Sequence, residues 1–375
     1  MKKIFWAIQN LACVGGTETV SIKLMDLLCS EYEIHLICTS EIKGDVVYDI
    51  DPRIQIHSLG IPEEVGRFDQ SFFSYCKKFQ IGKIFRLIHR TLSAYVFHRV
   101  KRRKLIESWM DEDSIYIGSA IDSYLLAPKH KRVFFHFHFD AKSFLSAVNQ
   151  FSFRHSAHAE KYIFLTKATL DKVVEKKPKL KDKASYVHNP IRFSPKEECD
   201  YHDNRILFVG RLTEQKDPML ALEIAKKLHD DKFPFSLQIY GDGHLEPKMR
   251  KFVEDNSLSE VTITGNHKVS AEDYLSSDLL LCTSAWEGFY LVSGEANANS
   301  CPVVTSSWKG PIEEAFKDGE SGWIIRSRDP ADYAKKIEEI LSNKEALADA
   351  KKRAYQDSFR LGEAPIKAKW EEILG

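Results

Sequence analysis

The sequence lacks any uninterrupted apolar run of the roughly 18 residues or more that a membrane-spanning helix needs. Its seven cysteines are scattered, no Cys-x-x-Cys pair occurs, and an odd number cannot be paired completely within one chain. These absences disfavour a membrane span and a complete disulfide framework. We interpret the cysteines as reduced thiols of a cytoplasmic protein, with Cys29, Cys38 and Cys282 as small core residues.

A secretory signal peptide is not evident, and neither is an internal repeat or a low-complexity tract. Two lysines follow Met1, but the apolar run after them is short and is broken by Gln9 and Asn10. This start is typical of a first buried strand, Ile4–Ile8.

The length of 375 residues suits two domains of roughly 150–200 residues each. The formal net charge is zero, yet the two halves differ in charge. Residues 1–190 hold 29 Lys and Arg against 21 Asp and Glu, and the remainder holds 25 against 33. A basic half joined to an acidic half predicts different partners for each.

Strand and helix patterns alternate, which predicts an α/β fold with doubly wound parallel sheets. The first half opens with strand Ile4–Ile8, a helix at about Thr17–Ser30 and strand Ile34–Thr39. The other predicted strands are Ser114–Gly118, Arg132–Phe137, Lys161–Leu165, Ile206–Val209, Ser236–Tyr240, Val261–Thr264, Leu279–Thr283, Val303–Thr305 and Trp323–Ile325.

A turn signal at Val187–Pro190 predicts the junction between the domains. We expect an N-terminal domain over 1–188, with a basic helical insert at about 62–110, and a C-terminal domain over 189–355. The helical tail, Ala346–Leu374, carries Trp370 as an apolar anchor. Its last part, 356–375, is expected to pack back on the N-terminal domain.

The sharpest motif spans residues 287–295, where two glutamates stand eight positions apart after a buried strand. Ligands of open α/β sheets bind at the carboxyl ends of the strands, so both carboxylates can face one ligand there. The helix that follows would point the amides of Tyr290, Leu291 and Val292 outward, which favours a phosphate. Alternatively, Glu295 only stabilises its own helix by charge–dipole attraction.

Three further motifs follow other predicted strands. Arg211 and Lys216 could reach one diphosphate, or could be two solvated basic residues. The glycines of the Gly241-Asp242-Gly243 turn allow close approach of the backbone to a ligand. Gly15-Gly16, before the first helix, could cradle a phosphate. Each of the two glycine motifs also fits a plain turn.

The segment Phe135–Asp140 ends a strand with two histidines on one face, His136 and His138. Two histidines could bind zinc, but no third or fourth ligand has convincing spacing. The alternative is a packed, hydrogen-bonded histidine pair.

Taken together, these motifs resemble family 4 of the retaining glycosyltransferases, whose fold is called GT-B. The resemblance runs over nearly the whole chain and is most specific from Arg205 to Gly322. It implies two Rossmann-like domains that face a cleft. The domain over 1–188 would lie on the acceptor side, and the domain over 189–355 would bind a nucleotide diphosphate sugar. The motifs that carry it are the Glu-x7-Glu pair, Val209-Gly210-Arg211-Leu212 with Gln215-Lys216-Asp217, Gly310–Glu313 and Asp318–Gly322.

The resemblance also implies a role for each matching residue. Glu295 would bind the donor ribose, and Glu287 would bind hydroxyls of the donor sugar. Arg211 and Lys216 would neutralise the leaving diphosphate, and His136 would lie beside the anomeric carbon. Other donor contacts would come from Gly15, Gly16, Gly210, Gly241, Gly243, Gly288, Phe289, Tyr290, Leu291 and Val292.

The implied reaction retains the anomeric configuration by attack on the same face, with no protein nucleophile, no cofactor and no metal. Three positions depart from the family pattern. Tyr290 replaces a small residue or proline, Asn297 a methionine, and Ser300 the glycine that usually ends the helix, although Asn299 could adopt that backbone conformation.

From Lys77 to Lys104 the chain carries ten Lys and Arg and no Asp or Glu, interleaved with apolar and aromatic residues. A basic amphipathic surface of this kind is attracted to anionic lipid. We expect peripheral contact with the inner face of the cell membrane and a saccharide or lipid-linked acceptor. The alternative is a helix with one core face and one solvated basic face, and nucleic acid is not expected.

Two other functions remain open. A nucleotide-sugar epimerase on the same fold would use the cleft without an acceptor. A non-catalytic, partner-binding relative would have lost its donor ligands, whereas Arg211, Lys216, Glu287 and Glu295 are all present here. The leading hypothesis is a UDP-sugar-dependent hexosyltransferase of cell-surface polysaccharide or glycolipid synthesis.

Overall fold

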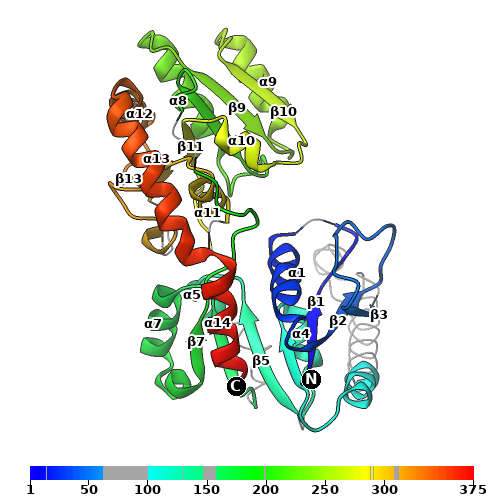
Figure 1. The fold of residues 1–375 in the computed structure, drawn as a ribbon. Coiled ribbons are helices and arrows are strands. Elements are labelled where there is room, and N and C mark those ends of the chain that lie inside the picture. The colour runs from blue at the N-terminus through cyan, green and yellow to red at the C-terminus, as the bar shows by residue number, and fades with distance from the viewer. Residues whose placement is uncertain are drawn as a thin grey trace. The chain divides into compact units, whose positions relative to one another are not determined.

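The computed structural model describes residues 1–13, 15–61, 100–129, 131–146, 158–197, 200–287, 289, 291–307 and 312–375. The chain divides into two compact units, Met1–Val187 and His188–Gly375. Each unit is an open parallel sheet with helices between its strands (Figure 1).

The first unit contains a seven-stranded sheet in the order β3-β2-β1-β4-β5-β6-β7, with every pairing parallel. The strands are β1 (Lys3–Ile8), β2 (Glu33–Ser40), β3 (Gln55–Ile61), β4 (Ile115–Gly118), β5 (Arg132–Phe137), β6 (Lys161–Phe164) and β7 (Ala184–Tyr186). The helices are α1 (Gly16–Leu28), α4 (Ile121–Leu126), α5 (Ala141–Phe144), α7 (Lys167–Lys176) and the 3-10 helix η2 (Pro178–Lys183), and residues 100–109 are also helical.

The second unit contains a six-stranded parallel sheet in the order β10-β9-β8-β11-β12-β13. The strands are β8 (Arg205–Val209), β9 (Ser236–Tyr240), β10 (Val261–Gly265), β11 (Leu279–Cys282), β12 (Val303–Ser306) and β13 (Gly322–Ile325). The helices are α8 (Pro218–Asp230), α9 (Glu246–Asp255), α10 (Ala271–Leu275), α11 (Leu291–Ala298), η3 (Ile312–Glu314), α12 (Pro330–Ser342), α13 (Lys344–Ser358), η4 (Phe359–Leu361) and α14 (Glu363–Leu374).

The core of the second unit lies on both faces of its sheet. Ile206 and Phe208 of β8 pack in one cluster with α8, α9 and α12, whereas Leu207 packs in another with α11. Successive residues of a strand point to opposite faces, so near-continuous apolar strands are what a sheet covered on both faces requires. The predicted doubly wound α/β fold is therefore confirmed.

The order of the strands reverses at one place in each sheet. In the second unit the chain runs outward from β8 to β10 and then returns to add β11 on the other side of β8. In the first unit the corresponding reversal lies between β1 and β4. At such a switch point the helices that follow the two strands lie on opposite faces of the sheet. The crevice at the carboxyl ends of the strands is where α/β proteins bind ligands.

The helical tail differs from its prediction in one respect. Instead of one helical stretch, Phe359–Leu361 forms a 3-10 turn and Gly362 is extended, which separates α13 from α14. Trp370 is fully buried, as predicted for an anchor. Packing of 356–375 on the first unit stays a prediction.

The helical prediction for 62–110 lies outside the described residues up to position 99. In the parts of the chain that the structure describes, no helix combines the length and the apolar character that crossing a bilayer demands.

Candidate functional site

The loops that follow β8 and β11 meet at the switch point of the second unit, because these two strands are neighbours. The loop after β8 carries Gly210, Arg211 and Lys216, and the loop after β11 carries Glu287. The structure therefore brings together two motifs that are more than 70 residues apart in sequence.

Lys216 and Glu287 form the central ion pair of these loops. Their Nζ and Oε1 atoms are 2.5 Å apart, and both side chains are largely buried. The hydroxyl of Ser284 donates to the same carboxylate oxygen at 2.8 Å. The structure thus places a buried cation and a buried carboxylate in direct contact at the switch point.

Gln215 connects the two loops a second time. Its carbonyl oxygen accepts a hydrogen bond from the Ala285 amide at 2.8 Å, and its side-chain nitrogen donates to the Trp286 carbonyl at 3.3 Å. Its side-chain oxygen accepts from Nη2 of Arg211 at 3.1 Å, so the exposed Arg211 guanidinium is also held.

The residue that caps the N-terminus of α8 adds a third link. Asp217 has left-handed backbone dihedrals (φ 45°), and its carboxylate accepts from the Leu220 amide and pairs with Arg328 at 2.5 Å. Arg328 also donates to the Thr283 carbonyl at 2.9 Å. The sequence interpretation missed Arg328, since nothing in the local pattern relates it to these loops.

Glu295 lies in α11, whose first two residues are Leu291 and Val292. Its carboxylate is 7% exposed, accepts from the Tyr274 hydroxyl at 3.0 Å and pairs with Arg192 at 3.2 Å. Burial raises the pKa of Glu295 above 4.5, while Arg192 and Tyr274 lower it in part. Arg192 and Tyr274 were missed by the sequence interpretation, because they are distant in sequence.

The glycines of the Gly241-Asp242-Gly243 turn have a structural reason in addition to the predicted one. A Cβ on Gly241, whose φ is 143°, would lie 1.9 Å from the Gly210 carbonyl oxygen. A Cβ on Gly243 would lie 2.3 Å from the Leu212 carbonyl oxygen. The loops after β8 and β9 cross in direct backbone contact, with the Leu212 amide donating to the Asp242 carbonyl at 2.7 Å. Only glycine allows this approach.

Phe289 is the described residue of the loop that joins Glu287 to α11, and its neighbours Gly288 and Tyr290 lie outside the described residues. Its ring stacks on the His188 ring, with centroids 5.5 Å apart. His188 in turn forms a 2.8 Å contact with the Glu314 carboxylate. The loop is therefore supported from the start of the second unit.

In the first unit, Gly15 caps the N-terminus of α1 and follows the loop after β1. Its amide donates to the Tyr48 hydroxyl at 2.8 Å, and that hydroxyl donates to the Cys13 carbonyl at 3.0 Å. A Cβ on Gly16 would meet nothing within 4 Å. The space at Gly16 is thus open, as a backbone contact with a ligand requires.

His136 is the last residue but one of β5, and His138 follows that strand. The two rings form the packed, hydrogen-bonded pair that was one of the alternatives, with Nε2 of His138 and Nδ1 of His136 3.1 Å apart. The Tyr124 hydroxyl donates to the His136 carbonyl at 3.1 Å. Burial lowers the pKa of both rings below 6.5, so both are neutral at pH 7.

No group of three or more His, Cys, Asp or Glu side chains in the described parts of the chain is placed to hold a metal ion.

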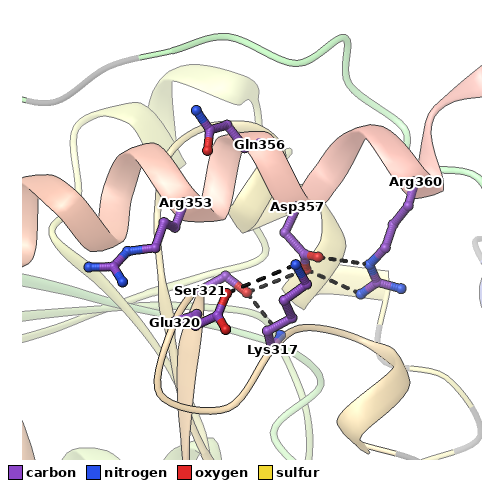
Figure 2. A pocket seen from close by; sticks show the side chains of 7 residues that line it. All are labelled: Lys317, Glu320, Ser321, Arg353, Gln356, Asp357 and Arg360. Atoms are coloured by element: carbon purple, nitrogen blue, oxygen red, sulfur yellow. Dashed lines mark hydrogen bonds and ion pairs between the residues drawn. The ribbon is translucent and has the colours of Figure 1, made fainter.

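A cavity of about 300 Å³ lies between α13 and the loop before β13, and none of the predicted donor ligands lines it. Figure 2 shows the side chains around it. Asp357 accepts from Arg360 at 3.1 Å and from the Ser321 hydroxyl at 3.3 Å. Arg360 also donates to the Glu314 carbonyl at 2.7 Å. We interpret this network as support for the 312–322 segment. The cavity is lined by Lys317, Glu320, Ser321, Arg353, Gln356, Asp357 and Arg360.

Comparison with known sequences agrees with this architecture. A family model described as glycosyl transferases group 1 matches residues 192–357. The amylovoran biosynthesis glycosyltransferase AmsD of Erwinia amylovora is 29% identical over 172 residues, which cover 46% of this chain and 48% of that protein. For each of the first four relatives, the match covers less than half of the relative's own length.

At least two relatives match this chain from end to end, and one of them is named for the reaction it catalyses. It is the GalNAc-alpha-(1->4)-GalNAc-alpha-(1->3)-diNAcBac-PP-undecaprenol alpha-1,4-N-acetyl-D-galactosaminyltransferase of Campylobacter jejuni. It is 22% identical over 395 residues, covering 100% of this chain and 98% of that protein.

The same fold is found in solved structures. A mutant of S. aureus TarM, in complex with Fondaparinux, alpha-GlcNAc-glycerol and UDP, matches 100% of both chains with a TM-score of 0.76 at 15% identity. Likeness at this identity shows the fold, which is GT-B. The chain therefore has the GT-B fold, and residues 192–357 of its second unit match the glycosyl transferases group 1.

Proposed function

We propose that this protein transfers a sugar from a nucleotide diphosphate donor to a saccharide or lipid-linked saccharide acceptor, with retention of anomeric configuration. The observation that carries the proposal is the buried Lys216–Glu287 pair at the switch point of the second unit, with Glu295 buried on the following helix. Two adjoining loops and one helix then supply three groups to the donor. These are the Glu287 carboxylate for the sugar, the Lys216 cation for the diphosphate and the Glu295 carboxylate for the ribose.

Each group has a defined task in this proposal. Glu295 accepts hydrogen bonds from ribose hydroxyls, and Arg192 and Tyr274 keep it oriented. Lys216 and Arg211 neutralise the charge that develops on the leaving diphosphate. Glu287 orients the donor sugar through its hydroxyls. His136, neutral at pH 7, offers its ring or its carbonyl beside the reacting carbon.

The proposed reaction breaks the bond between the anomeric carbon and the diphosphate oxygen. The acceptor hydroxyl oxygen forms the new bond on the same face, and its proton passes to the leaving diphosphate. No covalent sugar–protein intermediate is formed, so Glu287 and Glu295 do not act as the nucleophile and acid of a glycosidase. The step requires no metal, because the cationic side chains stabilise the leaving group.

A UDP-linked donor is the first choice to test, since TarM of this fold was crystallised with UDP. A lipid-linked saccharide is one acceptor class to test, because the Campylobacter relative is named for an undecaprenol-diphosphate-linked acceptor. With such an acceptor, the basic segment 77–104 would contact the inner face of the cell membrane, where we propose that the protein acts.

The test is a transfer assay with a panel of UDP-sugars, using the full chain and two variants, Lys216→Met and Glu287→Gln. We expect Lys216→Met to lose about 100-fold or more in kcat, because it removes a cation that stabilises the charge of the transition state. Glu287→Gln should lose about 100-fold as well, because the donor sugar is then held in a less reactive orientation. Lys227→Met, in an exposed i,i+4 pair on α8, serves as the control and should keep wild-type turnover. Thermal melting checks that each variant is folded.

Two results would contradict the proposal. If folded Lys216→Met and Glu287→Gln both keep wild-type turnover, the assignment of the site is wrong. Conversion of the donor to another nucleotide sugar without any acceptor would instead indicate an epimerase on the same fold.

A further inference from the structure

An exposed tryptophan stands beside the Lys216–Glu287 pair. The Trp286 side chain is 53% exposed, although it precedes a glutamate that is only 8% exposed. Among the described residues of the second unit, the only other exposed large apolar side chain is Phe359, at 51%. A single exposed apolar residue needs no explanation by itself. Whether Trp286 is suited to bind a ligand depends on how firmly its backbone is held.

That backbone is fixed on both sides of the ring. The Ala285 amide donates to the Gln215 carbonyl at 2.8 Å, and the Trp286 carbonyl accepts from the Gln215 side chain at 3.3 Å. The next residue, Glu287, is held by Lys216 and Ser284. Because the backbone is already held, a ligand that binds to the ring has to order only the side-chain torsions of Trp286. The loss of conformational entropy on binding is therefore small.

The proposed donor contacts follow an order along the loops, and this order indicates which part of the donor lies near the Trp286 ring. The ribose would lie at Glu295 on α11, the diphosphate at Arg211 and Lys216, and the sugar at Glu287. Trp286 directly precedes Glu287, and Gln215 bonds both to the Trp286 carbonyl at 3.3 Å and to the Arg211 guanidinium at 3.1 Å. Trp286 therefore adjoins the sugar end of the donor, whereas the base would lie beyond the ribose at the other end.

We propose that Trp286 is the saccharide-binding platform of the acceptor subsite, a role that rests on the function proposed above. The electron-rich face of an indole attracts positively polarised hydrogens, and one face of a pyranose ring presents such C–H groups. The ring would pack against the acceptor sugar whose hydroxyl attacks the donor. The acceptor class that follows is one with a sugar ring at its reacting end, free or attached to a lipid.

The experiment compares Trp286→Ala, Trp286→Phe and the wild-type full chain. Acceptors are drawn from a panel of free oligosaccharides and polyprenyl-diphosphate-linked oligosaccharides, and the best substrate of the wild type is used. We expect Trp286→Ala to raise the acceptor KM about tenfold or more, equivalent to one lost aromatic contact. Trp286→Phe should recover part of the loss. Donor hydrolysis without acceptor, UDP affinity and melting temperature should stay unchanged.

Phe359→Ala is the matched control, since it removes an aromatic ring of nearly equal exposure from η4 of the same unit. It should leave the acceptor KM unchanged. A second readout is quenching of tryptophan fluorescence by the same oligosaccharides, with the Trp286→Phe variant as the reference.

The outcomes separate the two proposals. An unchanged acceptor KM in Trp286→Ala, with donor cleavage intact, overturns the platform alone. A loss of UDP affinity equal to the loss of acceptor affinity assigns the ring to the donor and also overturns it, as does the absence of saccharide binding by the wild type in both readouts. A wild-type protein that cleaves no nucleotide sugar overturns the proposed function instead.

Discussion

The two glutamates of the Glu-x7-Glu motif lie in different electrostatic surroundings. Glu287 faces a lysine ammonium at 2.5 Å, whereas Glu295 shares its carboxylate between a guanidinium and a phenol in a buried position. Burial raises the pKa of Glu295 because the charged form loses its hydration, and the pairs with Arg192 and Tyr274 offset part of that loss. The ribose-binding role proposed for Glu295 therefore depends on these two partners.

This environment predicts how donor binding depends on pH. With its pKa raised, Glu295 takes up a proton at a pH above 4.5, and the neutral acid accepts hydrogen bonds from ribose less well. We expect affinity for a UDP-sugar to fall as pH drops through that raised pKa. Tyr274→Phe removes a hydrogen bond that lowers the pKa, so the fall should begin at a higher pH.

Calorimetric titration of the UDP-sugar between pH 7 and pH 4.5 would measure the effect, because the donor's diphosphate diester does not itself titrate there. Tyr333→Phe, which removes a buried hydroxyl outside the Glu295 network, is the control. The sign for stability is opposite: the contribution of Glu295 to the free energy of unfolding increases as pH falls through its raised pKa. Identical pH profiles for wild type and Tyr274→Phe would contradict the assignment.

The residue types in the sequence predicted the charged groups of the site, but they did not predict which side chains hold those groups in place. Two glutamates and two cations at strand ends could be found in the sequence, since strand patterns locate the loops. Arg192 lies 103 positions from Glu295, and Tyr274 lies 21 positions before it. No local pattern relates such residues, because the contact depends on how α10, α11 and the start of the second unit pack.

At the scale of elements, the strands that the sequence did not predict are both edge strands. In β3 (Gln55–Ile61) only Leu59 is buried among the residues whose side chains are described, and the three residues of β7 (Ala184–Tyr186) are half-buried. Strands at the edge of a sheet carry weak hydrophobic patterns, since they are covered less than central ones. The predicted central strands, which are buried on both faces, agree with the structure within one or two residues.

The end of α11 shows a turn chemistry that the sequence interpretation assigned to the wrong residue. The left-handed residue is Ser300 itself, with φ at 54°, and Asn299 instead donates from its side chain to the Glu295 carbonyl at 2.8 Å. The Ser300 hydroxyl lies 3.2 Å from the Lys196 carbonyl, which supports the unusual backbone. A serine thus occupies the position where the family usually has glycine.

Helix α13 is tied to the sheet by a buried ion pair, and this predicts a large effect on stability. Lys351 and Asp278 are 3.1 Å apart with side chains almost completely buried, and Asp278 also accepts from the amides of His202 and Arg205. Lys351→Met would leave the carboxylate buried without its cation. We expect a loss of about 3–5 kcal/mol in the free energy of unfolding.

The unfolding of the second unit in a urea titration would measure this loss of stability. Hydrogen exchange of the α13 amides would show whether the loss affects that helix. Lys227→Met, which breaks an exposed pair on α8, should change stability by no more than about 0.5 kcal/mol. Adding Asp278→Asn to Lys351→Met should recover part of the loss, because no unpaired charge then remains. Equal, small effects for Lys351→Met and Lys227→Met would show that the buried pair contributes little.

At the scale of the whole molecule, charge is divided between the halves of the chain. Residues 1–190 carry an excess of eight positive charges, from 29 Lys and Arg against 21 Asp and Glu, and the remainder carries an equal negative excess. The donor would thus bind to basic side chains within an otherwise acidic unit. The basic half supplies the charge for a different partner, which we propose is the anionic surface of the membrane.

The end of the basic segment 77–104 that the structure describes has one buried side and one exposed basic side, as binding to a membrane surface requires. In the helical residues 100–109, Ile106 is buried and Arg102 donates to the Gly60 carbonyl at 2.8 Å, whereas Lys101 and Lys104 are exposed. Each lysine near an anionic surface contributes about 1 kcal/mol of attraction, which salt screens within a Debye length. The wild-type protein should therefore float with phosphatidylglycerol vesicles at low salt and be released at high salt.

Replacing both exposed lysines, as Lys101→Glu with Lys104→Glu, changes the charge by four and should greatly reduce flotation while leaving donor hydrolysis intact. The same charge change at Lys226 and Lys227 on α8 of the second unit is the control, and it should have little effect if the attraction is local rather than a property of net charge. Equal losses from both pairs would indicate non-specific attraction. Failure of the wild type to float even at low salt, where the attraction is greatest, would leave the basic face as a solvated surface of a packed helix.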